Sequence, residues 1–161
     1  MSETIFVKEI RDEDFTNYKK SSMFIGFSKC SWKCEKECGM RVCQNSALAT
    51  APSIKMDVDK LVYRYINNPI TKAIVCGGLE PFDTWNDLKK LIVELRNKTN
   101  DDIVIYTGYK EDEIVSAVNW LVQFPNIIIK FGRFIPNQKP HYDDILGVKL
   151  ASNNQYAKKI S

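Results

Sequence analysis

The chain has 161 residues, of which 44% are hydrophobic and 27% are charged, and its net charge is +3. This length and apolar content suit a single domain, 1–161, and exclude a chain that is disordered along most of its length. Lysine and arginine are spread along the chain without forming a block, so the charge gives no support for nucleic-acid binding. Because no apolar run reaches the roughly 20 residues of a membrane helix and no signal-peptide pattern is present, we expect a cytoplasmic protein that does not bind a membrane.

Short apolar runs alternate with segments of helical periodicity. After a polar N-terminal segment, the predicted strands are Ser22–Phe27, Lys72–Cys76, Asp102–Tyr106 and Asn126–Phe131, and the predicted helices are Asp57–Asn68, Thr84–Asn97 and Glu111–Val122. Near-continuous apolar strands that alternate with helices indicate an α/β fold with a largely parallel sheet. The segment from Gly132 to Gly147 holds two prolines and is expected to be a long loop without regular structure.

Each predicted strand leads into a distinctive loop. A thiol-rich segment follows Phe27, GGLEP follows Cys76, TGY follows Tyr106 and GRF follows Phe131. Right-handed crossovers place the carboxyl ends of parallel strands at one edge of the sheet, where the ligands of open α/β sheets bind. We therefore expect the four loops to surround one site.

Four of the five cysteines, Cys30, Cys34, Cys38 and Cys43, lie in the stretch SKCSWKCEKECGMRVCQNSAL. An odd number of cysteines without a secretory signal disfavours a disulfide framework. Thiolates bind soft metals, so the candidates are a zinc ion and an iron-sulfur cluster. Zinc sites usually pair their thiols as CxxC, a spacing that is absent here, but a compact four-cysteine zinc or redox-sensing module stays open, as does a set of surface thiols without function.

Five short motifs, CSWKC, CQN, GGLEP, YTGY and SNNQ, resemble the radical SAM superfamily, and in particular the activating proteins of anaerobic ribonucleotide reductase. The resemblance implies a partial β/α barrel and a [4Fe-4S] cluster with three cysteine ligands, whose fourth iron is open to S-adenosylmethionine. It also implies reductive cleavage of that cofactor and formation of a glycyl radical on a partner, anaerobic ribonucleotide reductase. The electron donor would be a reduced flavodoxin- or ferredoxin-type protein. Another radical SAM enzyme, acting on a peptide or a small molecule, is the alternative within the superfamily.

The resemblance also implies which cysteines bind the metal. Cys30 and Cys34 are two of the ligands, and the third is Cys43 or, as the alternative, Cys38. Cys43 is favoured because Asn45 stands two residues after it, as an asparagine does in the family. No residue beyond the cluster ligands is expected to be catalytic.

The residues that the resemblance places at S-adenosylmethionine are Gln44, Asn45, Gly77, Gly78, Glu80, Thr107 and Gly108. The two adjacent glycines and Glu80 belong to the motif that holds the methionyl amino group, and the two residues after Tyr106 lie near the ribose or the methionyl carboxylate. The residues alone fit two further readings, in which the glycines form a tight turn and Thr107 bonds the backbone of a strand-to-helix turn. Cys76 is expected to be a buried core thiol.

Overall fold

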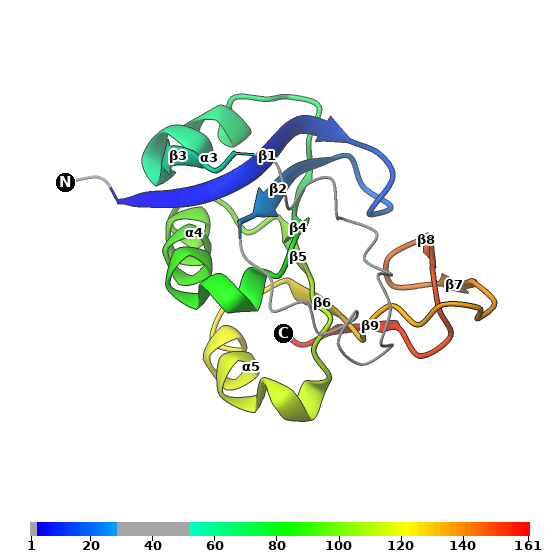
Figure 1. Cartoon of the computed structure of the whole chain (residues 1–161). Helices are drawn as coiled ribbons and strands as arrows, with labels where there is room; N and C mark the ends of the chain where they lie inside the picture. Colours follow the sequence, from blue (N-terminus) through cyan, green and yellow to red (C-terminus); the bar gives the residue numbers. More distant parts are fainter. Residues whose placement is uncertain (1–2, 29–51) are drawn as a thin grey trace.

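The structure is a computed structural model and describes residues 3–28 and 52–161. Seven strands form one sheet in the order β3-β1-β2-β4-β5-β6-β9, and β7 pairs with β8 in a separate hairpin (Figure 1). The strands are β1 (Thr4–Asp14), β2 (Ser22–Phe27), β3 (Ile54–Asp57), β4 (Ala73–Gly78), β5 (Asp102–Tyr106), β6 (Ile127–Phe131), β7 (His141–Asp143), β8 (Val148–Leu150) and β9 (Tyr156–Lys159). The helices are α3 (Val58–Ile66), α4 (Trp85–Lys98) and α5 (Val115–Leu121), with the 3₁₀ turns η1 (Pro81–Thr84) and η2 (Glu111–Glu113).

The four central strands, β2, β4, β5 and β6, run parallel to one another. Antiparallel strands flank them on both sides, with β1 and β3 next to β2, and β9 next to β6. The fold is therefore α/β with a mixed sheet, and the prediction of a largely parallel sheet is right only for its centre. Because β3 and β9 are the two ends of the strand order, the described strands show no barrel.

Three other elements differ from the sequence prediction. The polar N-terminal segment is strand β1, in which Ile5 and Val7 are fully buried while Phe6 between them is 48% exposed. This alternation is typical of a strand with one face in the core. The expected loop from Gly132 to Gly147 contains β7, and the helix expected over Glu111–Val122 is divided into η2 and α5.

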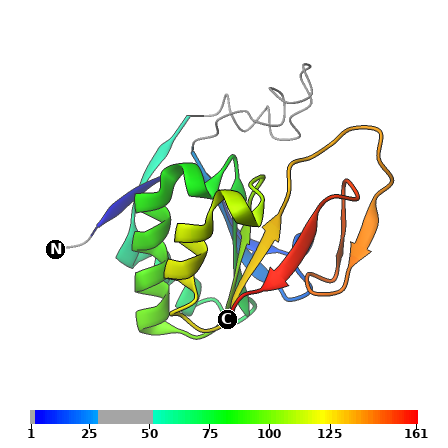
Figure 2. The same ribbon diagram turned by 90° about the horizontal axis from the view of Figure 1, so that it is seen from below.

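Different parts of the chain cover the two faces of the sheet (Figure 2). The three helices cover one face, where Ile74 and Ile105 of the sheet join Leu91 of α4 in one buried cluster. The segment that carries β7 and β8 covers the other face, where Leu150 joins Val104 of β5. Apolar side chains of the chain itself therefore bury both faces of the sheet.

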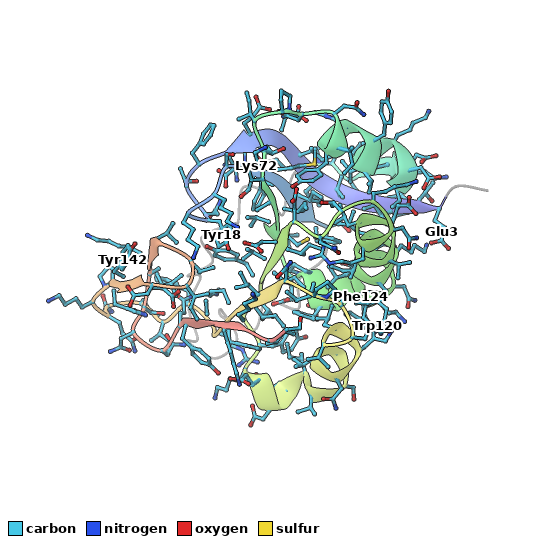
Figure 3. The ribbon with its side chains drawn as sticks, turned by 180° about the vertical axis from the view of Figure 1, so that it is seen from behind. Glu3, Tyr18, Lys72, Trp120, Phe124 and Tyr142 are labelled. Carbon is cyan, nitrogen blue, oxygen red and sulfur yellow. The ribbon has the colours of Figure 1, made fainter. Side chains whose placement is uncertain are left out.

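Aromatic side chains hold α5 against α4. Trp120 and Phe124 lie side by side, with ring centroids 5.1 Å apart (Figure 3), and Trp120 also meets Trp85 edge to face at 5.3 Å. Tyr142 of β7 lies at the opposite end of the molecule from these rings in the same view and is 61% exposed.

No helix within residues 3–28 and 52–161 is long and apolar enough to span a bilayer.

Candidate functional site

The carboxyl ends of the parallel strands meet at one edge of the sheet, which we call the ligand edge. Phe27, the last residue of β2, is in register with Gly78, the last residue of β4. Next to them, Thr107 directly after β5 donates its backbone N–H to the carbonyl of Lys130 in β6 at 2.9 Å. The loops after β4, β5 and β6 are therefore neighbours, as the alternation of strands and helices predicted.

The predicted metal ligands Cys30, Cys34, Cys38 and Cys43, and the predicted cofactor contacts Gln44 and Asn45, lie outside the described residues. Within the described ranges, no group of three histidine, cysteine, aspartate or glutamate side chains is arranged to hold a metal ion. The ligand set of the cluster therefore stays a prediction. In sequence, the cysteine segment continues from the end of β2, which is one of the strands that form the ligand edge.

Gly77 and Gly78 are the last two residues of β4, whereas the sequence prediction ended this strand at Cys76. Gly78 has a φ of +83°, and a Cβ atom there would lie 2.7 Å from the Cα of Gly26 and 2.8 Å from the backbone nitrogen of Phe27. A side chain at Gly77 would meet the ring of Phe24 at 3.0 Å. The backbone clash and the positive φ restrict position 78 to glycine, whereas a side chain at position 77 requires the Phe24 ring to shift.

Glu80 ties the loop after β4 to the loop after β5. Its carboxyl group is buried, and Oε1 accepts a hydrogen bond from the backbone nitrogen of Gly108 at 2.8 Å. Oε2 accepts hydrogen bonds from the hydroxyl of Thr107 at 2.8 Å and from the backbone nitrogen of Phe82 at 3.2 Å. The structure thus brings Glu80, Thr107 and Gly108 together, three of the residues that the sequence placed at the cofactor.

Thr107 also forms the turn that the residues alone allowed. Its Oγ1 accepts a hydrogen bond from the backbone nitrogen of Tyr109 at 3.0 Å, and the residue is 2% exposed. The hydroxyl group therefore has one donor and one acceptor partner within the chain. Contact of Thr107 or Gly108 with a ribose or a carboxylate stays a prediction.

The charge of Glu80 is the main electrostatic feature of the ligand edge. Burial raises its pKa to about 7, and the nearby Asp83 carboxylate acts in the same direction. The three hydrogen bonds oppose this shift because they stabilise the ionised form. No cation in the described part of the chain forms an ion pair with Glu80, so its negative charge is balanced only by hydrogen bonds there.

Arg133 is a residue of the ligand edge that the sequence analysis missed. It follows β6, is 5% exposed, and donates from Nη2 to Oε2 of Glu113 at 2.7 Å. Its guanidinium lies 5.8 Å from the ring centroid of Tyr109, and a Cβ atom on Gly108 would be 3.5 Å from its Cγ. The signal available in the sequence was an arginine two residues after an apolar strand, in a loop expected at the ligand edge.

A pocket of about 350 Å³ adjoins the end of β6 and is lined by Lys110, Glu111, Asp112, Phe131, Gly132, Asn154 and Tyr156. The carboxylate of Glu111 accepts hydrogen bonds there from the hydroxyl of Tyr156 at 2.5 Å and from the ammonium of Lys158 at 3.2 Å.

Cys76 is fully buried in β4, and burial raises the pKa of its thiol to about 12. The prediction that Cys76 is a core thiol is confirmed.

A family model described as a 4Fe-4S single cluster domain matches residues 19–156. The matched range includes the cysteine segment, the four parallel strands and the loops of the ligand edge. No curated protein matches the chain.

Replacing Gly78 with alanine is expected to destabilise the fold by about 2 to 3 kcal/mol, because the positive φ and the contact with Gly26 both strain a side chain there. Urea unfolding of the purified protein measures the loss. Gly108→Ala is the matched control, since the nearest atoms to its Cβ lie at 3.5 Å and beyond, an ordinary contact. Equal losses in the two variants would contradict this reading of Gly78.

The pKa of Glu80 predicts that the protein loses stability as the pH rises from about 4.5 to about 7. The folded chain keeps a proton that the unfolded chain, with the ordinary pKa of 4.5, releases. The stabilisation from Glu80 is therefore fully present below the pKa of the unfolded chain. It is lost as the pH rises to the pKa of the folded chain, and the loss is about 3 kcal/mol at most. We expect the free energy of unfolding to fall across this range in the wild type and to fall less in Glu80→Gln. The same pH dependence in both proteins would rule out Glu80 as its source.

Proposed function

Because the chain belongs to the family of 4Fe-4S single cluster domains, its cofactor is an iron-sulfur cluster, and we propose that it is a radical SAM activase. In this proposal Cys30, Cys34 and Cys43 hold the cluster, with Cys38 as the alternative third ligand. When bound, the reduced cluster would supply one electron to S-adenosylmethionine, which splits into methionine and a 5'-deoxyadenosyl radical able to take a hydrogen atom from a glycine Cα. The proposed fold is the partial β/α barrel of that superfamily, with β2, β4, β5 and β6 as parallel strands.

The observation that carries the proposal is the buried carboxylate of Glu80 at the ligand edge. It accepts three hydrogen bonds from the described residues, and a carboxylate has about four lone-pair sites, so the described part of the chain leaves one site for a ligand. A cationic group next to a buried carboxylate stabilises its ionised form and lowers its pKa. The methionyl amino group of S-adenosylmethionine is a group of this kind.

The surroundings of Gly108 support the same ligand. A Cβ atom on Gly108 would lie 3.6 Å from Oε1 of Glu80 and 3.5 Å from the aliphatic Cγ of Arg133, whose guanidinium is paired with Glu113. An amino acid group carries an ammonium and a carboxylate a few ångströms apart. In this proposal the ammonium of the cofactor would lie at Glu80, beside Gly108.

The proposed partner is a glycyl radical protein, anaerobic ribonucleotide reductase, with a reduced flavodoxin- or ferredoxin-type protein as the electron donor. The packing on the second face of the sheet is an argument for a macromolecular substrate. There Leu146 and Leu150 of the β7–β8 segment join one buried cluster with the sheet residues Phe24, Val75 and Val104. Within the described residues, this packing occupies the face on which a small substrate could otherwise be enclosed. A flexible backbone segment of a partner can instead approach along the ligand edge.

The test is an anaerobic purification followed by determination of iron, sulfide and zinc, and by EPR spectra of the reduced protein with and without S-adenosylmethionine. We expect iron and sulfide in the ratio of a [4Fe-4S] cluster and a signal that changes when the cofactor is added, because one iron has no protein ligand. Cys30→Ala and Cys34→Ala are expected to lose the cluster. Of Cys38→Ala and Cys43→Ala, only the second is expected to do so.

Three outcomes would contradict the proposal in different ways. Zinc without sulfide, with equal damage from each of the four cysteine variants, would identify a four-cysteine zinc or redox-sensing module. A cluster whose spectrum does not respond to S-adenosylmethionine would leave an iron-sulfur protein without this chemistry. Cleavage of the cofactor without formation of a glycyl radical on the reductase would indicate another radical SAM enzyme, acting on a peptide or a small molecule.

A further inference from the structure

The turn formed by residues 152–155 near the C-terminus consists of polar residues, two of which are buried. Ser152 is fully buried and Gln155 is 6% exposed. The hydroxyl of Ser152 donates to Oδ1 of Asn154 at 2.6 Å, and Oε1 of Gln155 accepts from the backbone nitrogen of Ser152 at 3.1 Å. These bonds fix the side chains of Asn154 and Gln155 relative to the turn.

The amide groups of Asn154 and Gln155 are directed at the backbone that follows β6. Nδ2 of Asn154 donates to the carbonyl of Arg133 at 2.8 Å, and Nε2 of Gln155 donates to the carbonyl of Gly132 at 3.3 Å. The ammonium of Lys130 also donates to the carbonyl of Gly132, at 3.0 Å. Buried carbonyls need donors, and here amide side chains from a distant turn supply them.

Gly132 is held on its other side by the loop after β5. Its backbone nitrogen donates to the carbonyl of Tyr109 at 3.0 Å. Its φ is +106°, and a Cβ atom there would lie 3.2 Å from Nδ2 of Asn154. The residue is therefore packed between the C-terminal turn and the loop that contains Gly108.

We propose that Asn154 and Gln155 are positioning residues of the ligand edge. By bonding the two consecutive carbonyls of Gly132 and Arg133, they place the Arg133 side chain against Gly108 and the ring of Tyr109. The inference rests on the proposed function, since S-adenosylmethionine is the ligand that the edge would bind. It assigns a role in cofactor affinity to the SNNQ motif, whose residues were not among the predicted site residues.

The test compares Asn154→Asp with Asn153→Asp in the cluster-loaded protein. The first change keeps the shape of the side chain but turns a carboxylate oxygen toward the carbonyl of Arg133. The second adds the same charge on the same turn at an exposed side chain. The dissociation constant of S-adenosylmethionine is measured by EPR titration, and amide hydrogen exchange is followed in peptides that contain residues 107–109 and 132–134.

We expect Asn154→Asp to raise the dissociation constant by about fivefold to tenfold, the effect of losing one partly buried hydrogen bond, with the cluster content unchanged. Exchange at residues 107–109 and 132–134 should become faster, and Asn153→Asp should match the wild type. Gly147, between β7 and β8, provides a stability control as Gly147→Ala, because its φ is +73° and a Cβ atom there would lie 2.6 Å from the Cβ of Lys19. It should lower the melting temperature without changing the dissociation constant.

Two results would overturn the positioning role while leaving the proposed function in place. One is an unchanged dissociation constant in Asn154→Asp. The other is a dissociation constant that rises in Gly147→Ala in proportion to the loss of stability of that variant. A wild-type protein that gives no response to S-adenosylmethionine contradicts the proposed function itself. In that case faster exchange in Asn154→Asp would show that the turn serves the fold alone, which also overturns the inference.

Discussion

The buried carboxylate of Glu80 is the contact on which the ligand edge depends. Each of its oxygens accepts a hydrogen bond from a backbone N–H, one from Gly108 and one from Phe82. A backbone N–H can only donate, so both positions require an acceptor atom. An amide in this place would direct its own N–H groups at one of these donors, so the geometry is complementary to a carboxylate. Burial disfavours the same ionised form, and the raised pKa is the result of this opposition. A cationic ligand would relieve it, which is why this one residue links the fold to the proposed chemistry.

The arrangement of strands explains why residues from distant parts of the sequence meet at this edge. Four parallel strands in sequence order end on the same side, so the loops after β4, β5 and β6 lie next to one another. The antiparallel additions, β1 with β3 and β9, widen the sheet without adding to the row of parallel strand ends. The β7–β8 segment then fills the face opposite the helices, and its buried residues Leu146 and Leu150 belong to that core. The flanking strands and the β7–β8 segment thus surround the four parallel strands, and the loops after these strands form the ligand edge.

The sequence was most informative where one physical signal dominated. The strands β2, β4, β5 and β6 are continuous apolar runs because both of their faces are buried, and all four were predicted. Strand β9, YAKK, has two lysines and lies at an edge, where charged side chains are favoured, so it carries no comparable signal. The rule that parallel strands end together was sufficient to place Glu80 near Thr107 and Gly108. The GRF loop and the SNNQ motif were noted in the sequence, but not the bonds of Arg133, Asn154 and Gln155, because these bonds span 20 residues or more.

Hydrogen bonds connect the loops of the ligand edge in series. Glu80 bonds the loop after β5, Tyr109 in that loop bonds Gly132, and Gln155 bonds the carbonyl of Gly132. Each loop is therefore held by the next, and the last link is a turn beside the outermost strand β9. Substitutions at two points of one connected network do not have additive effects, because the first change already releases part of what the second would disturb. For this reason the C-terminal turn belongs to the same cooperative unit as Glu80, although the two are separated by most of the second half of the chain.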